Sequence, residues 1–187
     1  QNDKDLNQNY TDALSGDGQT EKAIEVLERM TENYGKNLNP NLLIQIADLE
    51  ARIGNIEKSE ILLKDVINSH PRLFEAYRSL SSIKKFQKSD KIITQMEDYF
   101  KSTTLSQEET IQLGFAVGKA FYDISEYDKS FWAYSRANTA RREQLNYSTD
   151  EFSERIGIIK NTFDKKWFKK FENFKYQTNK PIFILGM

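Results

Sequence analysis

The chain has 187 residues, of which 29% are charged and 38% hydrophobic, and its mean hydropathy is −0.71. This composition is polar for a compact globule and suits an elongated helical protein with a thin core. Cys is absent and His70 is the single histidine, which excludes disulfide scaffolds, Cys/His zinc sites, thiol nucleophiles and most histidine-based catalysis. We therefore expect no metal site within the chain.

The net charge of −1 gives no reason to expect a nucleic-acid partner. The sequence has no apolar run of about 18 residues, so we expect no membrane partner and a cytoplasmic protein. Residues 1–60 carry 6 basic and 12 acidic side chains, whereas residues 160–180 carry 7 lysines against two acids. The basic stretch is interpreted either as the solvated face of an amphipathic helix or as a contact for an acidic surface or an anionic ligand.

Two six-residue segments, 54–59 and 125–130, follow one pattern of a turn-forming, a polar, an apolar, an acidic, a lysine and a small residue. Ala23 and Ser59 are 36 residues apart, and Ser59 and Ser130 are 71 apart, which is close to twice that spacing. This is the period of a helix–turn–helix repeat. The small residue lets the second helix of a unit lie close against the first.

The clearest unit covers residues 41–71. Pro40 begins its first helix, at a position where the missing N–H is not needed. His70 and Pro71 end its second helix, because the residue before a proline is driven out of the α region.

The next unit, residues 72–100, is degenerate. Its first helix has apolar residues at helical spacing, but its second half lacks the expected small residue. Ile92 and Phe100 still belong to an apolar stripe that predicts a helix over residues 90–100. A further unit covers residues 111–142.

A polar cap and acids at residues 147–151 begin a predicted amphipathic helix of about 25 residues with an aromatic stripe. We expect this helix to cap the repeats, to dock on the C-terminal segment after it, or both. After the polar linker 177–180, the apolar run 181–185 and Gly186 predict a buried strand that leads into a glycine-containing loop. Both ends of the chain are interpreted as cuts in a longer protein.

The repeats resemble the tetratricopeptide repeat (TPR), which has Leu and Gly on its first helix, a small residue on its second and a Pro at its end. The order of the segments resembles that of bacterial proteins in which such repeats precede a sulfotransferase domain. Four segments carry this resemblance: 77–97, 105–131, 134–142 and 180–187. The expected fold is all-α, a right-handed TPR-like solenoid of about four helical hairpins with a long C-terminal amphipathic helix and a short terminal β-strand.

The resemblance implies three parts: a repeat region (1–146), a capping or linker helix (147–176), and a linker with the first strand of a truncated sulfotransferase domain (177–187). In that family the strand continues into a loop that holds the 5′-phosphosulfate of 3′-phosphoadenosine 5′-phosphosulfate (PAPS). Gly186 and Met187 would lead into this loop. The resemblance therefore implies PAPS as a cofactor of the longer protein, and no catalytic residue, no cofactor and no sulfuryl transfer for this chain alone.

Four residues are the candidate groove or anion contacts. Arg141 and Arg142, with Arg136 a turn earlier, form a basic ridge, whose alternative interpretation is a solvated helix face with ion pairs. Asn138 lies at helical spacing from Tyr134, where a solenoid would face its concave groove. Its alternative interpretation is a buried amide satisfied by backbone groups.

Two functions are open. The first is the repeat region of a PAPS-dependent sulfotransferase, which supports the enzyme and recruits its substrate, with the sulfotransferase domain as its partner in cis. The second is a free-standing adaptor that binds a protein or peptide segment in its concave groove. A purely structural oligomerisation module is a third candidate, and the sequence does not choose among a protein tyrosine, a sugar and a small metabolite as sulfuryl acceptor.

Overall fold

The structure is a computed structural model that describes residues 2–34, 39–102, 104–145 and 148–172. The chain divides into two units, Gln1–Leu145 and Asn146–Met187. The described residues of the first unit form eight helices: α1 (Asn2–Gly16), α2 (Thr20–Tyr34), α3 (Pro40–Arg52), α4 (Ile56–Ser69), α5 (Phe74–Ile83), α6 (Lys91–Lys101), α7 (Gln107–Asp123) and α8 (Tyr127–Gln144). Those of the second unit form α9 (Thr149–Thr162) and α10 (Lys165–Lys169).

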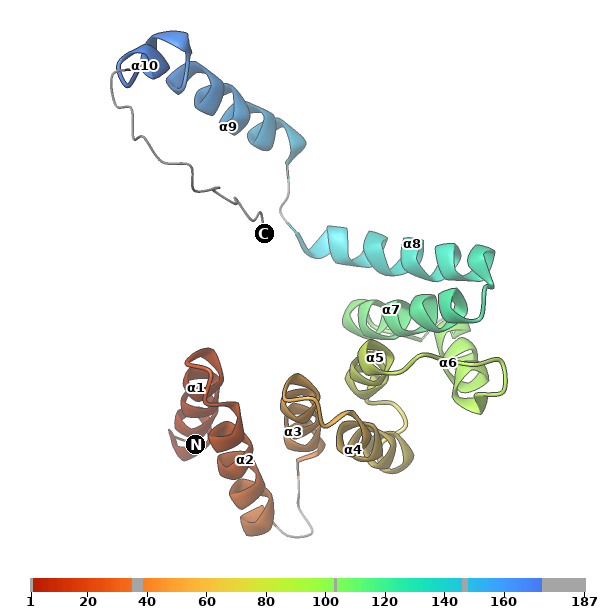
Figure 1. Ribbon diagram of the computed structural model, residues 1–187. Helices are drawn as coiled ribbons and strands as arrows, with labels where there is room; N and C mark the ends of the chain where they lie inside the picture. The colour runs from red at the N-terminus through yellow and green to blue at the C-terminus, as the bar shows by residue number, and fades with distance from the viewer. Residues whose placement is uncertain (1, 35–38, 103, 146–147, 173–187) are drawn as a thin grey trace. The chain divides into compact units, whose positions relative to one another are not determined.

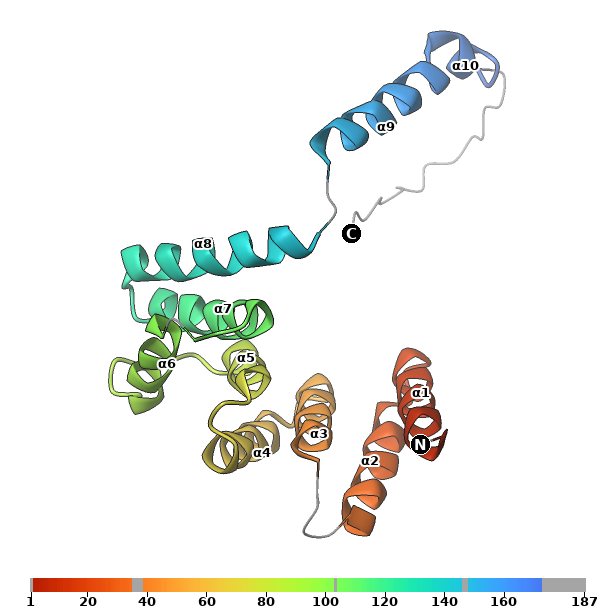
Figure 2. The ribbon, with the colours of Figure 1, turned by 180° about the vertical axis from the view of Figure 1, so that it is seen from behind.

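Helices α1 and α2, α3 and α4, and α7 and α8 of the first unit pack as antiparallel pairs, which confirms the predicted solenoid of helical hairpins (Figure 1). In both views of this unit, α1, α3, α5 and α7 line the inner side of a curve, and α2, α4 and α6 lie on its outer side (Figures 1 and 2). The first helix of each hairpin therefore presents one face to a shared inner surface.

Three of the four hairpin turns share one geometry. Each has a residue with positive φ, namely Gly18 (76°), Gly54 (91°) and Ser125 (65°). In the α3–α4 turn the N–H of Asn55 donates to the carbonyl of Glu50 (2.9 Å), and the turns before α2 and α8 have the same bond between residues five apart. This arrangement satisfies carbonyl groups that the helix end would otherwise leave without partners. The repeated sequence pattern thus corresponds to a repeated turn.

The predicted small residues lie where the two helices of a hairpin meet. Ala23 and Ser59 are fully buried, and Ser130 is nearly so. The hydroxyl of Ser130 donates to the carbonyl of Gly118 on α7 (2.8 Å). A methyl group added at Gly118 would lie 2.8 Å from the ring of Tyr134, so the close approach of α7 and α8 requires glycine there.

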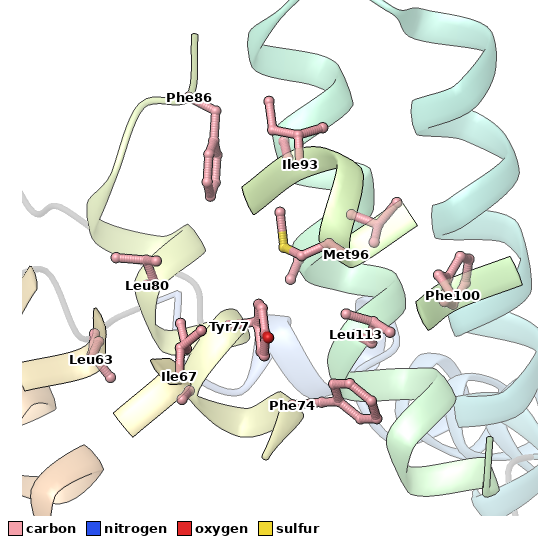
Figure 3. Close-up of a cluster of buried hydrophobic side chains, with 14 of the residues drawn as sticks. Leu63, Ile67, Phe74, Tyr77, Leu80, Phe86, Ile93, Met96, Phe100 and Leu113 are labelled. Atoms are coloured by element: carbon pink, nitrogen blue, oxygen red, sulfur yellow. The ribbon is translucent and has the colours of Figure 1, made fainter. Parts of the chain in front are cut away.

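Two apolar clusters form the core of the described part of the first unit. The smaller cluster joins α1, α2 and one face of α3. The larger one starts on another face of α3 and continues to α8 (Figure 3). Because α3 contributes Leu42, Ile46 and Leu49 to the first and Ile44 and Ala47 to the second, its remaining face is left for polar residues.

The third hairpin departs from the others, as its degenerate sequence predicts. Helix α6 packs mainly against α7 rather than against its own partner α5. The segment between α5 and α6 places the ring of Phe86 between the two helices, near Leu80, Ile93 and Met96 (Figure 3). The N–H of Phe86 donates to Asp123 on α7 (3.0 Å). A large side chain from the connection thus fills the space that a small residue closes elsewhere.

In the second unit, the stretch predicted as one long helix is divided into α9 and α10. The helix begins as predicted, because the Ser148 hydroxyl accepts from the N–H of Glu151 (3.3 Å). Asp164 causes the division, since its carboxylate accepts from the N–H of Trp167 (2.7 Å) and starts a new helix. The strand predicted over residues 181–185 lies outside the described residues.

Candidate functional site

The inner surface of the first unit has a groove with a volume of about 510 Å³. Its walls come from three successive first helices, α3, α5 and α7. The polar side chains that line it are Asp48, Arg52, Glu75, Arg78, Ser79, Ser82 and Gln112. Three hairpins therefore form the groove together, and its lining is predominantly polar.

Helical periodicity explains why these side chains face the groove. On α3 the core takes Ile44, Ala47 and their neighbours, so Asp48 and Arg52, four residues apart, share the opposite face. On α5 the residues 75, 78, 79 and 82 lie between the buried positions in the same way. Helices α3 and α5 thus each add a polar stripe to the groove, and α7 adds Gln112.

A smaller pocket of about 140 Å³ adjoins the groove at α1 and α3. Asp12, Ser15 and Gln45 line it, and it shares Asp48 and Arg52 with the groove. The guanidinium of Arg52 donates to the hydroxyl of Ser15 (3.0 Å), which links α3 to α1 at this point. Asp48 and Arg52 therefore connect the two spaces.

Asp48 is the groove residue with a perturbed pKa. Burial raises the pKa of this carboxyl above its usual range, and this effect exceeds the opposing effects of the hydrogen bond from Ser79 and the positive charge of Arg52. A carboxylate in such a place is stabilised by any further cation or hydrogen-bond donor that reaches it.

Two amide oxygens at these sites have no hydrogen-bond partner. Oε1 of Gln112 in the groove and Oε1 of Gln45 in the smaller pocket are both buried and unpaired. The other end of Gln112 is held, because its Nε2 donates to Glu108 (2.6 Å). Buried acceptors without donors are uncommon in folded proteins. Both oxygens have almost no accessible surface, so neither is exposed to the groove or to the pocket.

Charged residues near the N-terminus of α7 continue the polar surface. Hydrogen bonds from Gln112 and Gln144 lower the pKa of Glu108, and the charges of Arg141 and Arg78 act in the same direction. Arg141 itself donates to Gln144 (3.0 Å). Arg141 therefore lies in a network with an acid.

The structure places the other sequence-predicted contacts on α8. Arg136 lies over the ring of Phe100, 4.5 Å from its centroid, and donates to the Phe100 carbonyl near the end of α6. Its guanidinium therefore has a structural role. Asn138 and Arg142 are exposed, so the interpretation of Asn138 as a buried amide is wrong.

None of the four predicted contact residues lines the groove or the smaller pocket, so their role stays a prediction. Gly186 and Met187 lie outside the described residues. Sequence reasoning missed Asp48, Arg52 and Arg78. The signal was available in the spacing of polar residues on the first helices, opposite their apolar stripes.

Two further properties concern the described part of the chain. No group of three or more His, Cys, Asp or Glu side chains there is arranged to hold a metal ion. None of its helices combines the length and the apolar character that a membrane span needs.

Comparisons with known proteins give distant similarities. No family model matches the chain. An uncharacterized protein of Aquifex aeolicus (strain VF5) is 21% identical over 166 residues, which are 89% of this chain and 21% of that protein. The chain thus spans about a fifth of the length of this relative. The solved structure of a MamA RS-1 ArsTM double mutant is 18% identical, covers 74% of this chain and 75% of its own, and has a TM-score of 0.49.

Proposed function

We propose that the chain is a helical-repeat scaffold that binds an extended peptide segment of a partner protein in the groove of α3, α5 and α7. The observation that carries this proposal is the groove itself, whose polar lining comes from three successive hairpins. Small-molecule sites are mostly apolar and enclosed. An open polar groove instead suits a chain that carries its own hydrogen-bonding backbone.

The dimensions of the groove agree with a short peptide. Packed helices lie about 8–10 Å apart, so three first helices extend over roughly 16–20 Å. An extended chain rises about 3.3 Å per residue, so the groove matches about five or six residues.

The charged residues of the groove are expected to fix the orientation of the bound peptide. Arg52 and Arg78 supply positive charge, and Asp48 and Glu75 supply negative charge, so the groove has no large net charge. Mixed charges at an interface contribute more to specificity and association rate than to affinity. We therefore expect moderate affinity and a defined peptide orientation.

The test is a selection of random peptides against the full 187-residue chain, with affinity then measured on two charge-reversal variants. Arg78→Glu reverses a charge inside the groove, and Lys88→Glu makes the same change on the exposed connection before α6. We expect Arg78→Glu to weaken the selected peptides by about tenfold or more and Lys88→Glu to leave them unchanged. Equal affinities for the wild type and Arg78→Glu, or no selected peptide at all, would overturn the proposal.

A second candidate is that these repeats belong to a PAPS-dependent sulfotransferase and position a substrate for it. The sequence of residues 180–187 favours it, through the resemblance to the first strand of such a domain. The described residues hold no part of a phosphosulfate loop, so none of them is assigned to PAPS. The coding sequence after Met187 tests this candidate, because a Pro-Arg-Ser-Gly-Thr-Thr loop supports it and any other continuation counts against it.

A further inference from the structure

We propose that Arg78 determines the specificity of the groove by binding the carboxylate of an Asp or Glu side chain of the bound peptide. This inference rests on the proposed function and specifies the partner as a peptide segment with an acidic residue at one fixed position. Its basis is a guanidinium that lines the groove and has no hydrogen-bond acceptor among the described residues.

Arg78 is exposed in the groove, and its hydrogen-bond donors are not used inside the protein. Its guanidinium forms no hydrogen bond and no ion pair with any residue of the described ranges. Arg52, the other arginine of the groove, differs because it donates to the hydroxyl of Ser15 (3.0 Å) and its charge acts on Asp48. Arg78 is therefore the groove arginine that can bind a ligand without breaking a bond of the folded chain.

The ring of Phe115 positions the guanidinium of Arg78. Arg78 extends from α5 to α7, where its guanidinium carbon lies over the Phe115 ring, 4.8 Å from the centroid. Phe115 in turn packs on Tyr134 of α8, with 6.1 Å between the ring centroids. The N–H donors of a guanidinium lie in its plane, so packing on a ring occupies none of them. Arg78 can therefore offer two parallel donors to a planar carboxylate.

The charges around Arg78 favour a ligand with a single negative charge. On the α7 side, the positive charges of Arg141 and Arg78 both lower the pKa of Glu108, and two arginines with one carboxylate sum to +1. Asp48 and Glu75 line the rest of the groove. They would repel a phosphorylated side chain, which carries about two negative charges, more strongly than a carboxylate. A carboxylate is therefore the anion that this groove fits best.

A basic residue of the peptide does not fit at this position. It would bring a second positive charge to Arg78 and would leave the donors of the guanidinium without an acceptor. A bidentate carboxylate instead satisfies two of these donors at once. Arg78 therefore discriminates between the two signs of charge.

The test uses random hexapeptides with an acetylated N-terminus and an amidated C-terminus, so that side chains carry the only charges. They are selected against the full 187-residue chain. Calorimetry then compares a selected peptide with its amide analogue, in which Asn or Gln replaces the acidic residue. The proteins are the wild type, Arg78→Gln and the matched control Arg52→Gln, which removes the same charge from the same groove.

We expect Asp or Glu at one fixed position of the selected peptides. Its amide analogue should bind about tenfold more weakly to the wild type and to Arg52→Gln, and as well as the acidic peptide to Arg78→Gln. Arg78→Lys keeps the charge without the fork of donors, so it should retain part of the difference, and it serves as the second variant if Arg78→Gln does not fold. An equal loss on the wild type and on Arg78→Gln would overturn the role of Arg78.

A phosphoserine at the same position separates the two kinds of anion. We expect it to bind no more tightly than the carboxylate, because of the acidic residues in the groove. Tighter binding by tenfold or more would overturn the assignment to a carboxylate.

The selected peptides also separate this inference from the proposed function. Peptides that bind the groove without an acidic residue at a fixed position leave the proposed function standing and overturn the role of Arg78. The same holds if acidic and amide peptides bind the wild type equally. Failure to select any peptide overturns the proposed function, and the role of Arg78 with it.

Discussion

Single residues with positive φ determine the hairpin turns. Gly54 is at 91° and Ser125 at 65°, and the two occupy the same place in two copies of the sequence pattern. L-residues in this region are strained by contact between Cβ and the backbone, at a cost of about 1–2 kcal/mol. A Cβ at Gly54 would meet nothing within 4 Å, so a substitution there changes the backbone energy alone.

Reciprocal substitutions at these two positions are expected to have opposite effects. Gly54→Ser should lower the free energy of unfolding by about 1 kcal/mol, because it introduces the strain that Ser125 already bears. Ser125→Gly should raise it by up to about 1 kcal/mol, less the extra unfolded-state entropy of glycine. Urea unfolding of both variants checks this. Changes of the same sign would contradict the equivalence of the two turns.

Asp48 makes the stability of the folded state depend on pH, and the direction of this dependence follows from its raised pKa. Its folded-state pKa is raised above the usual 3.8, so the folded state holds the proton more tightly than the unfolded state. The stability due to Asp48 is therefore fully present below about pH 3.8 and is lost as the pH rises through the raised pKa. Asp12, Glu75 and the two arginines of the groove line the same two spaces as Asp48.

We expect Asp48→Asn to be more stable than the wild type at pH 7, and the difference to shrink as the pH falls toward 3.8. The amide oxygen introduced by this substitution would still accept the hydrogen bond from Ser79, without a buried charge. Urea unfolding of both proteins at several pH values measures the difference. A wild type that gains stability over the variant as the pH rises would contradict the burial effect. Glu75→Gln is the control for a general loss of negative charge.

At the scale of elements, the third hairpin shows how a departure from the pattern is compensated. Helix α6 has no small residue at the crossing point and packs on α7, and Phe86 fills the space next to α5. Phe86 is 2% exposed although it lies in a connection. A residue of a connecting segment thus belongs to the core, whereas the other buried hydrophobic residues of the described part lie in helices.

Phe86→Ala is expected to lower the free energy of unfolding by about 3–5 kcal/mol, because it leaves a cavity bounded by helices that cannot collapse. Phe131→Ala on α8 is the matched control. Phe131 is 76% exposed, so its loss should change stability by no more than about 0.5 kcal/mol. Thermal and urea unfolding distinguish the two. Similar effects of both variants would mean that Phe86 does not support the hairpin.

The helices and their turns could be predicted from the sequence in part, and most of the features that could not be predicted depend on contacts between distant segments. Apolar periodicity, Pro40 and the turn pattern predict the hairpins, since these signals are local. The division of the last helix escaped prediction because the aromatic spacing continues through Asp164, which acts as an N-cap. The groove depends on which polar stripes meet in space, which no single segment specifies. The contact between Arg136 and Phe100 could not be predicted for the same reason, since the two residues lie 36 positions apart.

At the scale of the whole molecule, the two units differ in how they hold their apolar residues. Every buried hydrophobic residue of the described part lies in the first unit. Helices α9 and α10 have no buried residue, and Trp167 packs among Phe163, Phe168 and Phe171 with those three rings exposed. The first unit therefore has a core of its own.

A chain that ends at Leu145 is expected to fold and unfold cooperatively. Its midpoint of thermal unfolding should lie within about 4 °C of that of the full chain, since no buried core residue is removed. Circular dichroism at rising temperature measures both. A much lower midpoint, or a loss of helix beyond that of the removed residues, would show that the first unit depends on the second.

The central claim is that the inner groove of the repeats receives a peptide. Its most direct measurement is NMR mapping of a selected peptide on the isotope-labelled 187-residue chain. The account predicts the largest signal changes at Asp48, Arg78 and Gln112, with small changes on the outer helices α2, α4 and α6. Signal changes confined to those outer helices or to α9 and α10, with the groove residues unaffected, would contradict it.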